Sequence, residues 1–385
     1  MNHLATPRSE MLHLLFNTWL ALACFYVGYF VNAVEDSSSS FFYIYDWPHL
    51  VNRYANFSDR PHHSHGVEMP NWKTNFGAGR LVSQNTSEYK TSQFALFKLM
   101  YERALIDPRR TLDPDKAVSF FIPYDFGMDA TFFETNGRMR KTNCPLASEV
   151  LLLLRRSPHF KKNAGHDHFM INAVNQNMNY FFHAKNCLEF LMTCWNCTKL
   201  SIDEYMFIAR DRKFELKNRG INWHAIPFPS DFHYDARISA IQASTPPPPP
   251  QNPTNSSPLY WHHPWELADS EDYRPTLVSF LGNPRKFSPV STSVREALLA
   301  QCNNHSTYCT HGIYSFDLKI ASPNYESRHS TFCLQPPGDM PTRKSVFDVI
   351  LAGCIPVLFH PLTARFMYEW HWGAKMWEEI GYVYT

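Results

Sequence analysis

Patterns of short apolar strands and amphipathic helices alternate along most of this 385-residue chain, and a proline-rich run interrupts them at residues 245–258. The run reads TPPPPPQNPTNSSP. Its prolines have no backbone N–H to donate and it has little apolar surface to bury, which favours an exposed, extended linker. Alternating strands and helices predict mainly parallel sheets covered by helices on both faces. We therefore expect an α/β fold of two domains, with ligands bound between them at the carboxyl ends of strands.

Apolar periodicity and turn residues place the expected elements on both sides of the linker. Before it we expect strands at 41–48, 118–122, 168–173, 205–209 and 223–227 and helices at 92–105, 146–155 and 188–192. After it we expect strands at 276–281, 331–334 and 355–359 and helices at 292–301 and 343–351. Each side is long enough to bury a core of its own.

The N-terminus carries a membrane signal. No Asp, Glu, Lys or Arg lies between Glu10 and Glu35, and the apolar run 12–33 is about the length that spans a bilayer. Because Arg8 precedes the run and acidic residues follow it, the charge bias predicts a type II membrane protein with a lumenal body. A signal peptide cleaved near Ala33 is the alternative. The expected tail, signal anchor and stem occupy 1–10, 11–34 and 35–42.

Sequons and cysteines agree with a lumenal body. Five N-x-[ST] sequons follow the apolar run, at Asn56, Asn85, Asn196, Asn255 and Asn304. Eight of the nine cysteines also follow it, an even number that suits disulfides. We expect Cys302 to pair with Cys309, and two of Cys187, Cys194 and Cys197 to pair with each other. The sequence leaves other partners open, including those of Cys144, Cys333 and Cys354.

Metal sites are weakly indicated. The CWNC segment at 194–197 has zinc spacing, but no second pair completes four ligands. The PHHSHG segment at 61–66 lies in a Pro/Ser/Gly context typical of an exposed loop. Asp113 and Asp115 could hold a metal on a diphosphate, yet their position before a strand favours a turn. We expect no bound metal and no cofactor.

Charge and motifs exclude other classes of protein. Lys and Arg number 36 against 35 Asp and Glu, and no block of like charge stands out, so nucleic acid is not an expected partner. No G-x-S-x-G motif is present, which argues against a lumenal hydrolase. The oligomeric state is left open.

The most informative segment runs from 330 to 361, STFCLQPPGDMPTRKSVFDVILAGCIPVLFHP. It predicts a strand, a turn at the Pro-Pro-Gly of 336–338, a helix and a second strand. Free N–H groups at the helix start form a site for phosphate. Arg343 lies there, where a cation opposes the helix dipole, so a ligand contact explains it better than helix stability does. Asp348 could accept hydrogen bonds from ribose hydroxyls. A buried unit with surface charges is the alternative.

The segment resembles the donor-binding signature of the exostosin glycosyltransferases, roughly S-x-F-C-L-x-P-x-G-D, then T-R, F-D and G-C-I-P-V. The matching residues are Ser330, Phe332, Cys333, Leu334, Pro336, Gly338, Asp339, Thr342, Arg343, Phe347, Asp348 and 353–357. Further family motifs follow in order over residues 40–372, at 44–48, 93–103, 121–124, 167–169, 274–275 and 280–285. The opening motif, the CLQPPGD spelling and the final F-H-P resemble the plant xyloglucan-galactosyltransferase branch.

This resemblance implies a GT-B fold of two Rossmann-like domains facing a cleft, at 43–240 and 264–385, with the linker at 241–263. It further implies inverting transfer of a sugar, with UDP-galactose as the expected donor, to a glycan or polysaccharide hydroxyl, without a metal and in the Golgi membrane (alternatively the endoplasmic reticulum). The expected donor-binding residues are Gly282, Arg285, Ser330, Gly338, Asp339, Thr342, Arg343 and Asp348. For the catalytic base the candidates are Asp167 and His168, with Asp125 as a further one.

Two departures from the family pattern qualify these expectations. His166 stands where the family has Arg before Asp-His-Phe. The sequence stops at Thr385, soon after the segment 368–371, where family members continue, so the resemblance allows an incomplete second domain. A lumenal glycan-binding or scaffold subunit that keeps the fold without turnover is therefore the alternative function.

Overall fold

The computed structural model describes residues 41–51, 75–83, 88–133, 139–173, 185–202, 222–233, 274–282, 289–312, 324–338, 341–360, 363 and 367–368. The expected tail, signal anchor and linker, and the expected strand at 205–209, lie outside these residues. Among the residues described, the structure contains no helix with the length and apolar character needed to cross a membrane.

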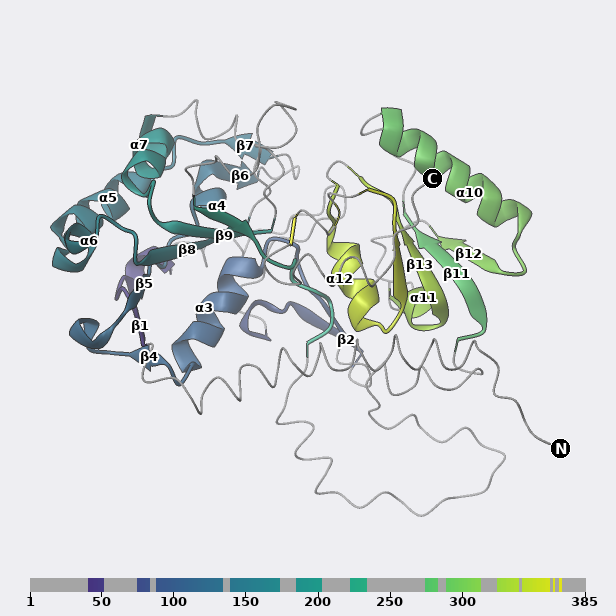
Figure 1. Cartoon of the computed structure of the whole chain (residues 1–385), viewed down its shortest axis with the longest axis horizontal. Helices are drawn as coiled ribbons and strands as arrows, with labels where there is room; N and C mark the ends of the chain where they lie inside the picture. Colours follow the sequence, from purple (N-terminus) through teal and green to yellow (C-terminus); the bar gives the residue numbers. More distant parts are fainter. Residues whose placement is uncertain are drawn as a thin grey trace, which may run out of the picture.

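The first half of the chain forms a six-stranded parallel sheet. Its strands are β1 (Phe42–Ile44), β4 (Arg110–Thr111), β5 (Ser119–Phe121), β8 (His168–Asn172), β9 (Thr198–Ser201) and β10 (Trp223–Ala225). They lie in the order β10-β9-β8-β5-β1-β4, and every neighbouring pair is parallel (Figure 1). The chain moves from β1 to β4 on one side and returns to β5 on the other. The junction of β1 and β5 is therefore a topological switch point, where open α/β sheets bind ligands.

Helices cover both faces of this sheet. They are α3 (Leu96–Ile106), α4 (Phe126–Ala130), α5 (Ala147–Arg156), α6 (Pro158–Lys162) and α7 (Lys185–Thr193), with 3-10 turns η1 (Asn75–Gly77) and η2 (Pro114–Lys116). Figure 1 places α5 and α7 on one side of the sheet and α3 on the other. In α5, Val150, Leu151 and Leu154 share the buried face, as helical periodicity requires. The next helix begins where the Ser157 hydroxyl accepts a hydrogen bond from the Phe160 N–H (3.3 Å).

Two antiparallel hairpins accompany the sheet. Strands β2 (Arg80–Ser83) and β3 (Glu88–Lys90) form one, and β6 (Thr131–Phe133) and β7 (Met139–Lys141) form the other. Gly79 enters the first hairpin with φ +86°, and an ideal Cβ there would lie 2.2 Å from the carbonyl oxygen of Lys90. Only glycine allows this close approach of the two strands.

The second half of the chain forms a four-stranded parallel sheet from β11 (Thr276–Leu281), β12 (Cys309–Gly312), β13 (Ser330–Gln335) and β14 (Ile355–Leu358). The strand order is β12-β11-β13-β14. Its helices are α10 (Pro289–Asn304), α11 (Tyr325–Arg328) and α12 (Lys344–Leu351), and α10 and α12 lie on opposite sides of the sheet (Figure 1). Because the strand order reverses between β11 and β13, this junction is a second switch point.

Helix α12 packs against both halves. Its residues Val346 and Phe347 belong to the same hydrophobic cluster as the core of the first sheet. The ring of Phe347 lies 6.1 Å from that of Phe228 and 5.1 Å from that of Tyr368, measured between centroids. On another side of the helix, Val349 packs with Cys333 and Cys354 of its own sheet. Any ligand that moves α12 therefore affects the contact between the halves.

Three disulfides join Cys144 to Cys187, Cys302 to Cys309 and Cys333 to Cys354. Of the pairings left open within the group at 187–197, those of Cys187 are excluded, because Cys187 is joined to Cys144. That bridge spans 43 positions of sequence, which corresponds to about 2–4 kcal/mol of stabilisation through the unfolded chain. Cys194 and Cys197 are buried as free thiols.

Candidate functional site

The switch point of the second sheet collects part of the expected donor site. Gly282 follows β11 directly, and its N–H donates to the carbonyl oxygen of Gly312 (3.1 Å), which joins the carboxyl ends of β11 and β12. Gly338 lies three residues beyond β13. A side chain would not fit at Gly282, since a Cβ there would come within 2.6 Å of the Phe280 ring. Arg285 and Asp339, which were expected here, lie outside the described residues.

Two guanidinium groups from different elements approach Gly338. A Cβ built on this glycine would lie 3.1 Å from Nη2 of Arg295 and 3.6 Å from Nε of Arg343. Arg343 is partly exposed, precedes α12 in extended conformation and donates to the carbonyl oxygen of Pro336 (3.3 Å). Arg295 comes from α10, is 1% exposed and donates through Nε to the carbonyl oxygen of Pro337 (3.0 Å). With the start of α12, they form a positive environment suited to an anion.

Two expected donor-binding residues have other roles. Ser330 lies at the amino end of β13, on the edge opposite Gly338, and its hydroxyl donates to the carbonyl oxygen of Glu326 (2.7 Å). Thr342 is buried, and its hydroxyl lies 2.9 Å from the hydroxyl of Tyr368. Ser330 therefore lies at the edge of the sheet away from Gly338, and the Thr342 hydroxyl bonds to Tyr368. The described contacts do not direct either side chain toward a nucleotide-sugar donor.

The carboxyl edges of the two sheets meet through Tyr368. Its hydroxyl donates to the carbonyl oxygen of Ile202 (3.1 Å), the residue after β9. Since the phenol has one proton, the Thr342 hydroxyl is the donor in their shared bond. Ile202 belongs to the carboxyl edge of the first sheet and Thr342 to the turn that leaves the second. The two edges therefore face each other at this point.

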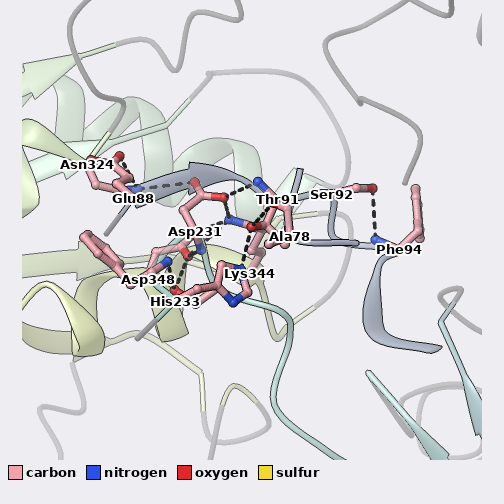
Figure 2. A network of polar contacts seen from close by, with 12 residues as sticks. Ala78, Glu88, Thr91, Ser92, Phe94, Asp231, His233, Asn324, Lys344 and Asp348 are labelled. Carbon is pink, nitrogen blue, oxygen red and sulfur yellow. Dashed lines mark hydrogen bonds and ion pairs between the residues drawn. The ribbon is translucent and has the colours of Figure 1, made fainter. Parts of the chain in front are cut away.

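Asp348, expected to hold a ribose, is instead part of a buried polar network between the halves (Figure 2). It is 3% exposed, and its Oδ1 accepts hydrogen bonds from the Ser230 hydroxyl and the Asp231 N–H, both at 2.8 Å. The ammonium of Lys344 lies 2.9 Å from Asp348 Oδ2 and 2.6 Å from Asp231 Oδ1. These contacts occupy the carboxylate from within the protein, so the expected ribose contact is not supported by its position.

The network continues to the first hairpin and to α11. Asp231 Oδ1 accepts from the N–H of Thr91 (3.0 Å), and Oδ2 accepts from the amide of Asn324 (3.2 Å). Asn324 also donates to Glu88 Oε1 (3.0 Å), while Arg328 pairs with Glu88 Oε2 at 3.1 Å. Figure 2 shows Asn324 beside Glu88 of β3, with Asp231 lying between them and the α12 residues Lys344 and Asp348. Helix α11 is thus tied directly to the hairpin through Glu88, and α12 is tied to it indirectly through Asp231.

Burial controls the protonation of the network. Loss of hydration raises the pKa of the Asp348 carboxyl to about 6, against the opposing effect of the Lys344 ammonium. Burial also lowers the pKa of His233 to about 4, helped by the charges of Arg103 and Lys344. His233 Nε2 lies 2.7 Å from the Thr91 hydroxyl, which also donates to the carbonyl oxygen of Ala78 (2.7 Å).

The base candidates Asp167 and His168 lie at the amino end of β8, away from the carboxyl edge where acceptor chemistry was expected. His168 Nδ1 lies 2.7 Å from Asp167 Oδ1, and Nε2 lies 2.8 Å from the Tyr45 hydroxyl. The ring stacks on Phe120 at 4.8 Å between centroids. Burial lowers the pKa of His168, so the neutral ring donates to Asp167 and accepts from Tyr45. The pair therefore lies at the opposite edge of the sheet from the first switch point, and its role as the base stays a prediction that this position does not support.

Asp125 is the candidate that the structure places at the carboxyl edge. It follows β5 at the first switch point and caps α4, because Oδ1 accepts from the Met128 N–H (3.1 Å). The same oxygen accepts from the N–H of Ala173, the residue after β8 (3.4 Å). Burial is the main cause that raises the pKa of Asp125 to about 7, and the nearby Asp129 carboxylate contributes. A carboxyl that titrates near neutral pH is suited to proton transfer.

Other sequence expectations concern glycans and metals. Of the sequons, Asn196 and Asn304 lie in the described residues, the former donating to the carbonyl oxygen of Ala164 (3.2 Å). Asp113 caps η2 by accepting from the Asp115 N–H (3.1 Å), which is a structural use of that pair. Among the described residues, no group of three or more His, Cys, Asp or Glu side chains is placed to hold a metal. The sequons at 56, 85 and 255 and the histidines of 61–66 lie outside.

Comparison with known proteins connects these features to a family. The Exostosin GT47 domain matches residues 42–380. A probable xyloglucan galactosyltransferase of Arabidopsis thaliana is 29% identical over 322 residues, covering 80% of this chain and 49% of that protein. Xyloglucan-specific galacturonosyltransferase 1 of the same plant is 28% identical over 341 residues, covering 86% and 45%. Xyloglucan galactosyltransferase MUR3, also from Arabidopsis thaliana, is 26% identical over 358 residues, covering 88% and 51%.

The chain spans about half the length of these relatives. The matched region nevertheless includes both parallel sheets, both switch points and every described residue except the first. Since this match covers most of the sequence, the chain belongs to the family defined by the Exostosin GT47 domain.

Proposed function

We propose that this chain transfers a sugar from a nucleoside diphosphate donor to a hydroxyl of a polysaccharide. The observation that carries the proposal is the approach of Arg295 and Arg343 to Gly338 at the switch point of the second sheet. The diphosphate that leaves in such a reaction is an anion, and fixed positive charge stabilises it as it forms. The names of the relatives, xyloglucan galactosyl- and galacturonosyltransferases, support sugar transfer to a polysaccharide.

The two arginines have different tasks in this proposal. Arg343 is partly exposed and contacts the diphosphate, with the N–H groups at the start of α12 beside it. Arg295 is buried and fixes the turn by its bond to Pro337, while adding positive charge behind the site. The arrangement supplies the charge that metal-independent transfer requires, which supports the expectation that no metal is needed.

The facing carboxyl edges support a GT-B arrangement with the acceptor on the first sheet. Tyr368 joins the two edges, and each sheet has its switch point on the edge concerned. Inverting transfer needs a base that takes the acceptor proton. We assign this task to Asp125 because it lies at the switch point of the first sheet. Its carboxyl is fully covered, so the assignment requires that acceptor binding opens this edge.

UDP-galactose is the donor that we propose, since two of the compared relatives are named as galactosyltransferases. The galacturonosyltransferase among them makes UDP-galacturonic acid the competing donor. The membrane signal and sequons of the sequence support a type II Golgi location, with the glycan acceptor in the lumen.

The test is transfer by the purified full chain. It should be incubated with each UDP-sugar and with xyloglucan oligosaccharides, and the products analysed by mass spectrometry. A product one hexose heavier with UDP-galactose is the expected result. Binding of UDP-sugars without transfer would favour the inactive glycan-binding subunit. Absence of both binding and transfer would contradict the proposed function.

A further inference from the structure

The turn between α7 and β9 contains two cysteines that have no disulfide partner. Cys194 and Cys197 are both 0% exposed. The other six cysteines in the described part of the chain are joined in three bridges. Because Cys187 pairs with Cys144, Cys194 and Cys197 are the two unbridged cysteines of the group at 187–197, and two residues separate them.

The backbone of this turn brings the two cysteines together. The Cys197 N–H donates to the carbonyl oxygen of Cys194 (3.1 Å), which closes a turn of four residues. Residues at the ends of such a turn have Cα atoms less than about 7 Å apart. A disulfide requires a Cα separation of about 4.4–6.8 Å, so the two ranges overlap. Both side chains are also buried, so they share the interior beneath this turn.

The surroundings hold the turn in this form. The buried ammonium of Lys199 donates to the carbonyl oxygens of Cys194 (2.5 Å), Trp195 (3.0 Å) and Cys197 (2.8 Å). On the other side, a Cβ on Gly165 would lie 3.0 Å from the sulfur of Cys197, so glycine leaves the space that this sulfur needs. Three carbonyl contacts from one cation fix the turn whether the sulfurs are bonded or not.

We propose that Cys194 and Cys197 form a fourth disulfide, which closes by exchange with a disulfide-bearing oxidant. One cysteine sulfur attacks the incoming disulfide and releases its first thiol. The second cysteine then attacks the mixed disulfide, forms the Cys194–Cys197 bond and releases the second thiol. Two electrons pass from the cysteine pair to the oxidant, and the two thiol protons end on the released thiols.

Burial determines when this exchange takes place. Loss of hydration raises the pKa of the Cys194 thiol, which disfavours the reactive thiolate in the folded protein. Both sulfurs are also covered, so neither an oxidant nor a reductant reaches them easily. The bond therefore forms while the turn is still accessible during folding, and it then persists.

A single tryptic peptide tests the proposal. Residues 186–199 lie between Lys185 and Lys199 and contain Cys187, Cys194 and Cys197. The full chain is expressed in the secretory pathway, extracted with detergent without reductant, freed of N-glycans, denatured with iodoacetamide, digested and weighed. The expected peptide is cross-linked through Cys187 to Cys144, carries no alkyl group and is lighter by two hydrogens than its form with free Cys194 and Cys197.

The bond from Cys187 to Cys144 is the internal control, because it reports on the same molecule. Alkylation of Cys194 and Cys197 while Cys187 stays cross-linked would overturn the proposal, and so would a bond from either of them to another cysteine. The measurement is repeated across a glutathione redox series, so that samples with a closed control bond are always included. The Tm of the wild-type chain should change across the glutathione series. In the double variant C194A/C197A this change should be smaller, by the contribution of the Cys194–Cys197 bond.

Discussion

At the scale of single residues, the cation of Arg343 precedes the first turn of α12, where it does not stabilise the helix. Arg343 opposes the dipole there and is partly exposed, so Arg343→Ala should leave Tm nearly unchanged. Loss of charge-assisted hydrogen bonds, each worth about 1.5–3 kcal/mol, should weaken UDP binding by about 10- to 100-fold. Isothermal titration calorimetry with UDP measures the binding, and calorimetric unfolding measures Tm.

Arg295→Ala is the matched variant, because this arginine is buried. It should lower both Tm and UDP affinity, since its removal leaves the turn at Pro337 without a donor. If Arg343→Ala instead caused a large fall in Tm with UDP affinity intact, Arg343 would be a structural residue.

The base assignment separates two carboxyl groups of the first half. Asp125→Asn keeps the shape of the side chain but removes the proton acceptor, so kcat should fall by about 100-fold or more with donor affinity near wild type. Asp167→Asn should change kcat much less, because Asp167 lies at the amino end of β8 and bonds to His168. Initial rates at saturating donor and acceptor measure both. The opposite ranking would restore Asp167 as the base.

Residue positions, as distinct from roles, could be predicted from the sequence where a turn or helix start defines them. Gly338 and Arg343 lie beside each other as expected, because the Pro-Pro-Gly break and the helix start are local features. Arg295 could not be found, because its burial depends on how α10 packs and the helix pattern around it resembles a surface. Asp348 was assigned to a ligand because the sequence does not show that Lys344 and Asp231 would occupy it.

At the scale of elements, apolar periodicity predicted the longer helices and the central strands in the described residues, but not the short hairpin strands or the short helices α4, α6 and α11. Strand β11 has the expected bounds, and α5, β8, α12 and β14 are within one residue of them at each end. Strand β9 was not expected, because its sequence Thr-Lys-Leu-Ser has a lysine inside it. Lys199 is buried there only because three carbonyl groups receive its ammonium.

The anchoring of α12 leads to a prediction for stability. Lys344→Met leaves Asp231 and Asp348 buried without their cation, which should lower the free energy of unfolding by about 3–5 kcal/mol. In a cycle with Asp231→Asn, the two losses should be non-additive by about 1–3 kcal/mol. Urea unfolding of wild type, both single variants and the double variant measures this coupling.

The exposed pair Lys116–Asp113 provides the control, since its side chains are 70% and 47% exposed. Lys116→Met should change the free energy of unfolding by less than about 1 kcal/mol. Additive losses for Lys344 and Asp231 would show that the two residues do not act as a pair, and the network would then not join the halves through them.

At the scale of the whole molecule, the sequence predicted parallel α/β sheets but not how they meet. Alternation of elements is local and therefore readable, whereas the contact between the halves depends on a few side chains far apart in sequence. Glu88 pairs with Arg328, and Tyr368 reaches Ile202, across separations that no periodicity reports. The domain boundaries at 240 and 264 remain predictions, because they lie outside the described residues.

Contact between the halves should depend on pH through Asp348. Its pKa is about 6 in the folded protein against an ordinary 3.8, so the folded state holds the proton more tightly than the unfolded chain. Stability from this group is complete below about pH 4 and is lost as the pH rises to about 6. Asp125 acts in the same direction, up to about pH 7. His233, with a pKa of about 4, acts in the opposite direction, losing stability as the pH falls from about 6.5 to 4.

These three groups change stability in opposite directions, so the pH dependence of wild-type stability alone does not isolate Asp348. The difference in stability between wild type and an Asp348 variant does isolate it. Asp348→Asn removes the titrating group, so the stability of wild type relative to the variant should fall by on the order of 1–3 kcal/mol between pH 4 and pH 7. Urea unfolding at several pH values measures the difference. For Asp113→Asn, at an exposed carboxylate, the difference in free energy of unfolding between wild type and variant should change little over the same pH range. A difference for Asp348→Asn that rises with pH would mean that Lys344 controls the ionisation of Asp348 more strongly than burial does, and the network would then tighten toward neutral pH.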